Sequence, residues 1–402
     1  MPDPHPSASR GQFLLLGCAG FASMASMRIC DTMLPELARS FQVSTGTAAG
    51  AISMFAIAYG ILQLVYGPLG DRYGKQRVIF FAVSACALFN LALAFAPSIP
   101  VLVALRGLSG AAAAGIIPLS MAFIGDSVAY EERLDTLARF LSATIAGMIF
   151  GQWVGGLFAD TLGWHAAFVL LALLFGCVAV LMRRGAAASP RGAARQGYMA
   201  QVGGIVRIAW ARRILAAVLV EGAFAYSAFV FIPTHLHDRF GLPLVAAGGI
   251  VVMYGVGGLC YTMVARRLVR RIGERGMAAG GGAMMAVGFA ALAAGPHWVW
   301  AVPACLVAGF GFYMMHNTLQ ANATQMAPQA RGTAVSLFAS SLFLGQSLGI
   351  SGVAALIDRS GTNVAFVPSL AVLPLLGAGL AWAMARRNLG APRRDPPAGR
   401  RR

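Results

Sequence analysis

The fold is decided by the stretch Gly67-Pro68-Leu69-Gly70-Asp71-Arg72-Tyr73-Gly74-Lys75-Gln76-Arg77, which lies between two apolar runs that can each cross a bilayer. Its glycines let the backbone turn sharply and approach a neighbouring helix closely. Three cations, Arg72, Lys75 and Arg77, stand close together in it. Short loops rich in Lys and Arg stay on the cytoplasmic side of a membrane. The stretch therefore predicts a cytoplasmic turn between two membrane-spanning helices.

The composition of the 402-residue chain is that of a membrane protein. Hydrophobic residues make up 58% of the chain and charged residues 11%. Apolar runs of about 20 residues, the length that a spanning helix needs, recur from end to end. We therefore expect an all-α membrane protein with twelve transmembrane helices, at residues 13–37, 46–69, 77–96, 100–124, 137–161, 164–183, 214–237, 243–265, 276–296, 298–322, 333–357 and 364–385.

The basic residues predict which side each loop faces. All but five of the 31 Lys and Arg residues lie in the terminal segments or in the loops 70–77, 125–139, 183–213, 266–275 and 323–332. The five others are Arg39, Arg239 and Arg359 in the opposite loops and Arg28 and Arg106 within spans. This asymmetry predicts a multi-pass protein of a bacterial-type inner membrane with both termini in the cytoplasm. Because the excess charge follows the loops, it gives no reason to expect a nucleic-acid partner.

The sequence repeats itself over two halves of six spans. A shift of 199 residues lays Asp71-Arg72-Tyr73-Gly74 on Arg270-Arg271-Ile272-Gly273. Such an internal match predicts two halves related by a pseudo-two-fold axis along the membrane normal. We expect a cytoplasmic N-terminal tail, an N-terminal six-helix bundle, a cytoplasmic linker, a C-terminal six-helix bundle and a cytoplasmic C-terminal tail, at residues 1–12, 13–183, 184–213, 214–385 and 386–402.

The linker and the C-terminal tail have the composition of irregular chain. Gly185–Gln196 is rich in Ala, Gly, Pro, Ser and Arg, which is typical of a linker. Tyr198–Arg213 fits an amphipathic helix on anionic lipid, with Ile205, Ile208 and Trp210 inward, and fits a disordered tether equally well. We expect Ala391–Arg402, which is rich in Pro and Arg, to be disordered.

The opening stretch resembles the signature loop between the second and third helices of major facilitator superfamily transporters, through its pattern Gly-x-x-x-Asp-Arg-x-Gly-Lys-x-Arg. The resemblance implies the major facilitator fold, and a cytoplasmic gate made of Gly67, Asp71, Arg72, Gly74, Lys75, Arg77 and Asp126. By the same resemblance, Asp71 faces the start of span eleven, near residues 332–335, and Arg72 pairs with Asp126. The alternative is a solvated cluster of exposed ion pairs.

Span five contains a second motif, Gly147-Met-Ile-Phe-Gly151-Gln152-Trp-Val-Gly155-Gly156. It is similar to the antiporter motif of the twelve-helix drug/proton antiporter branch, Gly-x-x-x-Gly-Pro-x-x-Gly-Gly, with Gln152 in place of the proline. This resemblance implies export in exchange for protons. The alternative is that the glycines serve only close helix packing.

Two of the charged residues within spans lie at the same depth. A charge at the bilayer centre costs about 3 kcal/mol, so each one needs a reason. Asp31 on span one and Arg106 on span four both lie roughly 9 Å from the outer surface, so we expect them to meet and to couple protons. Arg106-Gly107-x-Ser109-Gly110 also resembles the family's span-four motif Arg-x-x-Gln-Gly, whose arginine is associated with proton coupling. The alternative is a local pair of Arg28 with Asp31, three residues apart on one helical face.

A second pair of titratable residues shares a depth in the other half. Glu221 on span seven and His316 on span ten both lie roughly 10 Å from the cytoplasmic surface. Glu221 is expected either to hold a cationic group of a substrate or to share a proton with His316. A buried histidine is also often only hydrogen-bonded. The expected substrate-binding residues are Glu221, His316, Asn317, Arg28 and Tyr226.

No enzyme signature is present in the sequence. It has no Walker loop, no His/Glu metal cluster and no nucleophile elbow, and its six cysteines lie in apolar runs without metal-ligand spacing. We therefore expect no cofactor and no metal, and a gradient of ions as the source of energy.

The expected function is a monomeric secondary active transporter that exports a small organic molecule, drug-like or a metabolite, in exchange for protons by alternating access. Two alternatives within transport stay open: a siderophore, sugar or other metabolite exporter, and a proton-coupled importer. A third alternative is a membrane receptor of the same fold that transports nothing.

Overall fold

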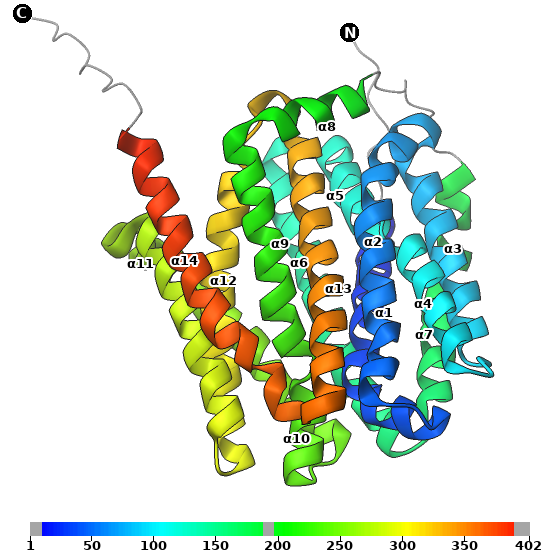
Figure 1. Cartoon of the computed structure of the whole chain (residues 1–402). Helices are drawn as coiled ribbons and strands as arrows, with labels where there is room; N and C mark the ends of the chain where they lie inside the picture. Colours follow the sequence, from blue (N-terminus) through cyan, green and yellow to red (C-terminus); the bar gives the residue numbers. More distant parts are fainter. Residues whose placement is uncertain (1–9, 188–196, 390–402) are drawn as a thin grey trace, which may run out of the picture.

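The computed structural model describes residues 10–187 and 197–389, and these residues form helices joined by short turns, with no β-strand among them (Figure 1). Most of the predicted N-terminal tail, residues 188–196 of the predicted flexible linker and the predicted disordered C-terminal tail lie outside the described residues. The helix α8 lies at the top of Figure 1. We call this the inner side of the molecule and the opposite one the outer side.

Seven helices make up the first half. They are α1 (Arg10–Phe41), α2 (Thr45–Tyr73), α3 (Lys75–Leu93), α4 (Ile99–Ala113), α5 (Ile116–Ser127), α6 (Tyr130–Asp160) and α7 (Trp164–Ala187). The predicted fourth span is divided into α4 and α5 because Pro118 has no N–H for the carbonyl of Ala114 and its ring would clash there. Six spans are therefore built from seven helices.

The second half contains α8 (Tyr198–Arg207), α9 (Ala209–Val230), α10 (Ile232–Phe240), α11 (Leu244–Ala294), α12 (Ala301–Gln325), α13 (Arg331–Ser360) and α14 (Val367–Leu389). Three short 3₁₀ turns separate the last of them: η1 (Trp298–Trp300), η2 (Pro328–Ala330) and η3 (Thr362–Ala365). The predicted seventh span is divided into α9 and α10 near Pro233, for the same reason as the fourth.

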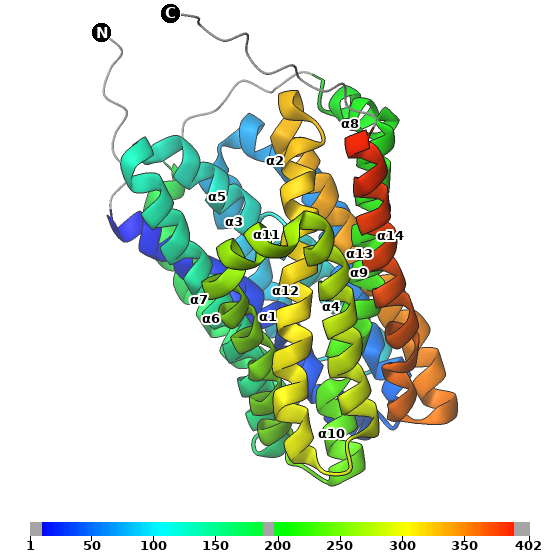
Figure 2. The same cartoon turned by 90° about the vertical axis from the view of Figure 1, so that its left-hand side faces the viewer.

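The long helix α11 contains two of the predicted spans. Eleven helices of the described chain are long and apolar enough to cross a membrane, and α11 is 51 residues long. It bends at Gly273, whose φ of 64° lies in the left-handed region. Gly273 is the residue that the internal repeat aligns with Gly74, whose φ of 91° separates α2 from α3. Both copies of the repeat thus place a glycine where the chain bends, and the bend of α11 is seen in Figure 2. With α11 counted as two spans, the eleven helices provide the twelve spans that were predicted.

The linker forms a helix that is shorter than the amphipathic alternative predicted. Helix α8 ends at Arg207 because Arg212 Nη1 donates to the carbonyls of Val206 at 3.1 Å and Arg207 at 2.9 Å. Ile205 is buried as expected, whereas Ile208, expected to point inward, is 40% exposed. The partly buried Trp210 lies under Arg387, with the guanidinium 4.6 Å from the ring centre.

Glycine stripes bring α6 and α13 into close contact with their neighbours. A Cβ added at Gly147, Gly151 or Gly155 of α6 would lie 2.2–2.4 Å from a backbone carbonyl of α1. A Cβ added at Gly345 or Gly349 of α13 would lie 2.0 or 1.8 Å from a carbonyl of α9. The glycines of the span-five motif therefore have a packing role, and the other half has its own equivalent stripe.

Alanine substitutions on α13 test this packing. We expect Gly349→Ala to lower the melting temperature of the purified protein, because an overpacked contact costs about 1–3 kcal/mol. The control is Gly352→Ala on the same helix, where an added Cβ would meet nothing within 4 Å. Alanine is the better helix former by about 1 kcal/mol, so the control should be neutral or stabilised. Equal melting temperatures for the two variants would contradict the packing role of Gly349.

Candidate functional site

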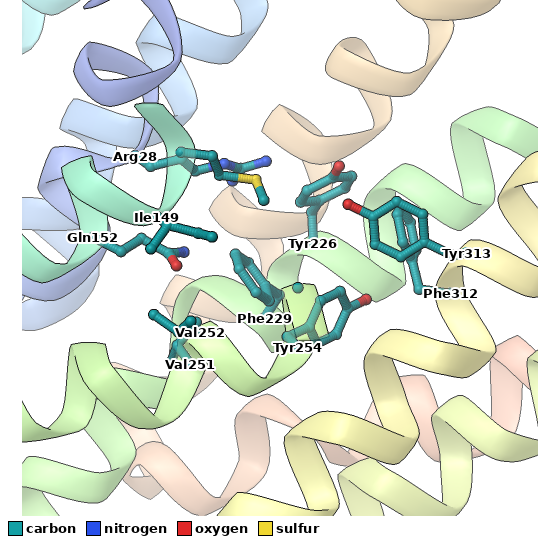
Figure 3. A pocket seen from close by; sticks show the side chains of 12 residues that line it. Arg28, Ile149, Gln152, Tyr226, Phe229, Val251, Val252, Tyr254, Phe312 and Tyr313 are labelled. Carbon is teal, nitrogen blue, oxygen red and sulfur yellow. The ribbon is translucent and has the colours of Figure 1, made fainter. Parts of the chain in front are cut away.

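A small group of polar and aromatic side chains, which we call the central cluster, lies where α1 and α6 of the first half face α9, α11 and α12 of the second (Figure 3). The first half contributes Arg28 and Gln152, and the second half contributes the aromatic side chains of Tyr226, Phe229, Tyr254, Phe312 and Tyr313. The free space between them is about 20 Å³, roughly the room that one water molecule needs. A larger ligand therefore has to displace side chains or separate the halves.

Arg28 connects an acid of its own half to aromatic rings of the other half. Its Nη1 lies 3.5 Å from Asp31 Oδ2, and both side chains are buried. Its guanidinium carbon lies 4.7 Å from the ring centre of Tyr226 and 5.4 Å from that of Phe229. Cation–π contacts of this kind strengthen when they are shielded from water. A change in the charge of Asp31 would therefore act on a contact between the two halves.

Several buried polar atoms of this cluster lack a hydrogen-bond partner. They include Arg28 Nε, Asp31 Oδ1 and Gln152 Nε2. The Gln152 side chain lies beside the Asp31 carboxylate. Buried polar groups are costly when unpaired, so they mark places where a proton, a water or a ligand can be bound. Gln152 thus faces the centre of the molecule, a location that its place in the span-five motif did not predict.

Arg106 is held by backbone carbonyls instead of the expected carboxylate. Its Nε donates to Ala51 O at 3.2 Å and its Nη1 donates to Ser26 O at 2.9 Å. The guanidinium also lies over the ring of Phe55, 4.2 Å from its centre. The expected pairing with Asp31 is therefore not formed in this conformation. Asp31 has the local alternative partner, Arg28, because residues three apart share one face of a helix.

The other predicted pair is formed. His316 Nδ1 lies 2.8 Å from Glu221 Oε2, which joins α12 to α9. Glu221 is buried, and its Oε1 has no hydrogen-bond partner. The His316 ring stacks on Phe312 with 5.1 Å between the ring centres, which places the pair beside the aromatic cluster. A neutral histidine and a carboxylic acid, or their charged forms, both fit this geometry.

The remaining predicted substrate-binding residues divide into two groups. Tyr226 lines the central cluster as expected, together with Arg28. Asn317 does not, because its side chain lies beside Tyr261 of α11 instead. Sequence reasoning missed Phe229, Tyr254, Phe312 and Tyr313. The sequence holds a sign of them, because some of these aromatic residues lie one helical turn from a predicted site residue. Phe229 follows Tyr226 by three residues, and Phe312 precedes His316 by four.

On the inner side, Lys75 takes the position that Arg72 was expected to hold. Lys75 Nζ lies 2.5 Å from Asp126 Oδ2 and 3.6 Å from Asp71 Oδ1. The chain reverses at Gly74, which turns Lys75 toward the end of α5. Arg72 is exposed instead, with its guanidinium 5.2 Å from the ring centre of Tyr73.

The predicted contact between the gate loop and span eleven is also absent in this conformation. Asp71 forms its ion pair with Lys75 and has no hydrogen bond to the start of α13 among the described residues. Thr333, at that start, donates to Gln201 of α8 at 2.8 Å. A Cβ at Gly67 would meet nothing within 4 Å, and Arg77 is exposed beside Phe81. The inner ends of α2 and α13 are thus not joined by these gate residues.

The larger hollow of the molecule lies elsewhere. It is lined by apolar side chains of α1, α5, α6 and α7, with Asp135 and Arg139 at its rim. Leu14 and Leu181 in its wall are 69% and 63% exposed, which indicates a surface that faces lipid. Within residues 10–187 and 197–389, no three His, Cys, Asp or Glu side chains are grouped to hold a metal ion. The central cluster is therefore the better candidate for a functional site.

Comparison with known proteins identifies the family. The model of the Major Facilitator Superfamily matches residues 16–350. The chain belongs to this superfamily of membrane transporters, which are not enzymes. It is 24% identical over 333 residues to the MFS-type transporter YceJ of Bacillus subtilis, covering 80% of this chain and 83% of YceJ.

Two further comparisons are partial or structural. The efflux pump FUB11 of Gibberella fujikuroi is 29% identical over 153 residues, which is 38% of this chain and 26% of the pump. Several curated relatives are matched over only 26–37% of their own length. A bacterial homologue of the lysosomal transporter Spinster, in an inward-facing and unoccupied conformation, superimposes with a TM-score of 0.77 at 14% identity, covering 95% of this chain and 98% of the homologue. This likeness concerns the fold.

The ion pairs of the gate loop can be tested through Lys75, which is the only lysine of the chain. We expect Asp126→Asn to increase the rate of amine acylation at Lys75 about 1.4- to fivefold, since an exposed ion pair contributes about 0.2–1 kcal/mol. The rate is measured by mass spectrometry of the peptide that contains Lys75. Asp135→Asn, which removes only the partner of Arg139, is the control. An unchanged rate in Asp126→Asn would contradict a stabilising ion pair between Lys75 and Asp126.

Proposed function

We propose that this transporter exports a small organic molecule, drug-like or a metabolite, in exchange for protons. The observation that carries the proposal is the buried Arg28–Asp31 pair, which faces aromatic rings of the opposite half across the central cluster. Intramembrane ionisable groups are expensive and mark ion or substrate pathways. The protein acts as a monomer in an inner membrane, with the arginine-rich inner side in the cytoplasm.

Asp31 is the proton site in this proposal. The guanidinium of Arg28, 3.5 Å away, favours the charged form of this carboxylate. Protonation of Asp31 removes that attraction and frees Arg28 from its own helix. Because Arg28 also lies over Tyr226 and Phe229, the exchange changes how the two halves contact each other. Two discrete arrangements of this kind are what an alternating-access carrier requires.

Arg106 has a supporting role in the proposal. Its hydrogen bonds tie α4 to the backbones of α1 and α2. It therefore provides a fixed positive charge near Asp31, while Arg28 is the partner that moves. Substrate and proton compete for Asp31, since either one can bind its unpaired Oδ1.

The direction of transport is supported by two further observations. Some relatives are named efflux pump FUB11 or multidrug resistance protein Stp. The span-five motif, with Gln152 in place of proline, is similar to that of drug/proton antiporters. A siderophore, sugar or other metabolite exporter, a proton-coupled importer and a non-transporting receptor are the alternatives that the experiments below distinguish.

Asp31→Asn tests the coupling. We expect it to abolish substrate-dependent proton movement in proteoliposomes, because the amide cannot titrate, while downhill substrate exchange persists in part. The measurement uses a pH dye inside the vesicles, after substrates found by a thermal-shift panel are added. Asp31→Glu is the control, since it keeps a titratable group and should retain some coupling.

The outcomes of this experiment separate the candidates. Normal proton movement in Asp31→Asn would overturn the assignment of Asp31 as the coupling site. Proton entry together with substrate, instead of against it, would establish an importer. Binding without any flux in the unsubstituted protein would establish a receptor.

The Glu221–His316 pair gives a second candidate role, recognition of a positive charge on the substrate. Glu221 Oε1 is buried and unpaired beside the aromatic cluster, so a cation can be bound there by the carboxylate and the ring faces. We expect Glu221→Gln to weaken binding of cationic compounds at least tenfold more than binding of neutral ones of similar shape. Binding is measured by titration calorimetry. Equal losses for both classes would favour a proton or packing role for Glu221.

A further inference from the structure

On the outer side, an aspartate at the end of α6 caps the start of α11. Asp160 Oδ1 accepts a hydrogen bond from the backbone N–H of Leu244 at 3.1 Å, and Asp160 Oδ2 accepts one from Val245 at 2.7 Å. These N–H groups are the first of α11, so they have no partner within their own helix. The positive end of the helix dipole favours a carboxylate at this place. Asp160 belongs to the first half of the molecule and α11 to the second.

A second aspartate, from the second half, caps the start of a helix of the first half. Asp358, near the end of α13, accepts hydrogen bonds from the N–H of Gly46 at 2.8 Å and from the hydroxyl of Ser44 at 2.7 Å. Ser44 is the N-cap of α2 and Gly46 lies in its first turn. Here the carboxylate comes from the second half and the helix start from the first.

The two caps are equivalent under the internal repeat. Helix α6 is the fifth span and α13 the eleventh, while α2 is the second span and the first part of α11 is the eighth. The cap from span five to span eight therefore corresponds to the cap from span eleven to span two. Among the described residues, the hydrogen bonds that cross between the halves on the outer side all end on Asp160 or Asp358.

The backbones of the two halves are closely packed around the caps. A Cβ at Gly46 would lie 2.4 Å from Asp358 Oδ2, and one at Gly156 would lie 2.4 Å from the carbonyl of Leu244. At the inner ends of the corresponding helices, a Cβ at Gly67 or at Gly332 would meet nothing within 4 Å. The halves are thus in close contact at their outer ends.

We propose that Asp160 and Asp358 form the outer gate of the transporter. Both caps hold the outer side closed, and both have to release before the halves can separate toward the outside. This gating role follows from alternating access in the family and does not depend on export, on protons or on any substrate. It assigns to two exposed carboxylates a part in the transport cycle, beyond the buried charges of the central cluster.

The test measures how often the outer side opens. Spin labels are placed at Phe95 of the first half and Val299 of the second, outer positions that are 73% and 51% exposed. The six native cysteines are replaced beforehand, and the full-length protein is studied in lipid nanodiscs. Distances between the labels, measured by double electron–electron resonance, give the populations of the closed and open outer side.

Removing one cap should increase the open population about fivefold, since an N-cap contributes about 1 kcal/mol. Asp160→Ala and Asp358→Ala should each show this shift, and the double variant should increase the open population roughly 25-fold. The two caps share no contacting residues, so their effects on the free energy should add. Asp→Asn at either position keeps an acceptor oxygen and should shift the population less. If an alanine variant does not fold, the asparagine variants still provide the comparison.

Glu36→Ala is the matched control. Glu36 is also a carboxylate at the outer end of a helix, but it bonds only Arg39 and Ser40 of its own helix. Its removal should leave the distances between the labels unchanged. Unchanged distances in the double aspartate variant, with or without a lower melting temperature, would overturn the gate and leave the caps a purely structural role. That result would not affect the test of Asp31, which reads proton movement.

Discussion

A charged side chain within a membrane span must find its partners inside the protein, because the hydrocarbon offers none. The structure meets this constraint in two ways. Arg106 keeps its charge and is stabilised by carbonyl groups of α1 and α2 and by the ring of Phe55, all of which are fixed parts of the first half. The pairs Arg28–Asp31 and Glu221–His316 each contain a side chain that can gain or lose a proton. Only the second kind of solution can change during a transport cycle.

The halves can move as units because each is packed through its backbone. Glycines of α6 bring this helix against α1, and those of α13 bring it against α9, at distances that leave no room for a side chain. Near the outer ends the two halves also pack through their backbones, since a Cβ at Gly46 or Gly156 would lie 2.6 or 2.4 Å from a carbonyl of the other half. The polar contacts between the halves are few. At the centre they are ring faces around Arg28, and at the outer end they are carboxylates on helix starts. Each half can therefore move as a unit only when the close packing and the polar contacts at the outer ends are released together.

Much of this architecture could be predicted from the sequence, since span length, charge asymmetry and proline or glycine positions act along the chain. The turn at Gly273 was implied by its match with Gly74, and both have positive φ. The side-chain pairs were harder. Counting residues gives the depth of a group but not the direction in which it leaves its helix. Lys75 meets Asp126 in place of Arg72 because the turn at Gly74 rotates it toward α5.

The two depth-based pairings show where this method of prediction stops. Glu221 and His316 share a depth and lie on helices α9 and α12, which pack directly on each other, so their side chains meet. Asp31 and Arg106 also share a predicted depth, but α4 packs mainly against α2 and α3, and the arginine reaches carbonyls before it reaches the acid. Two side chains on different helices must thus share a depth to form a pair, and they meet only if their helices pack directly on each other. Asp31 was left with the partner one turn away, and that partner, Arg28, is the one that touches the opposite half.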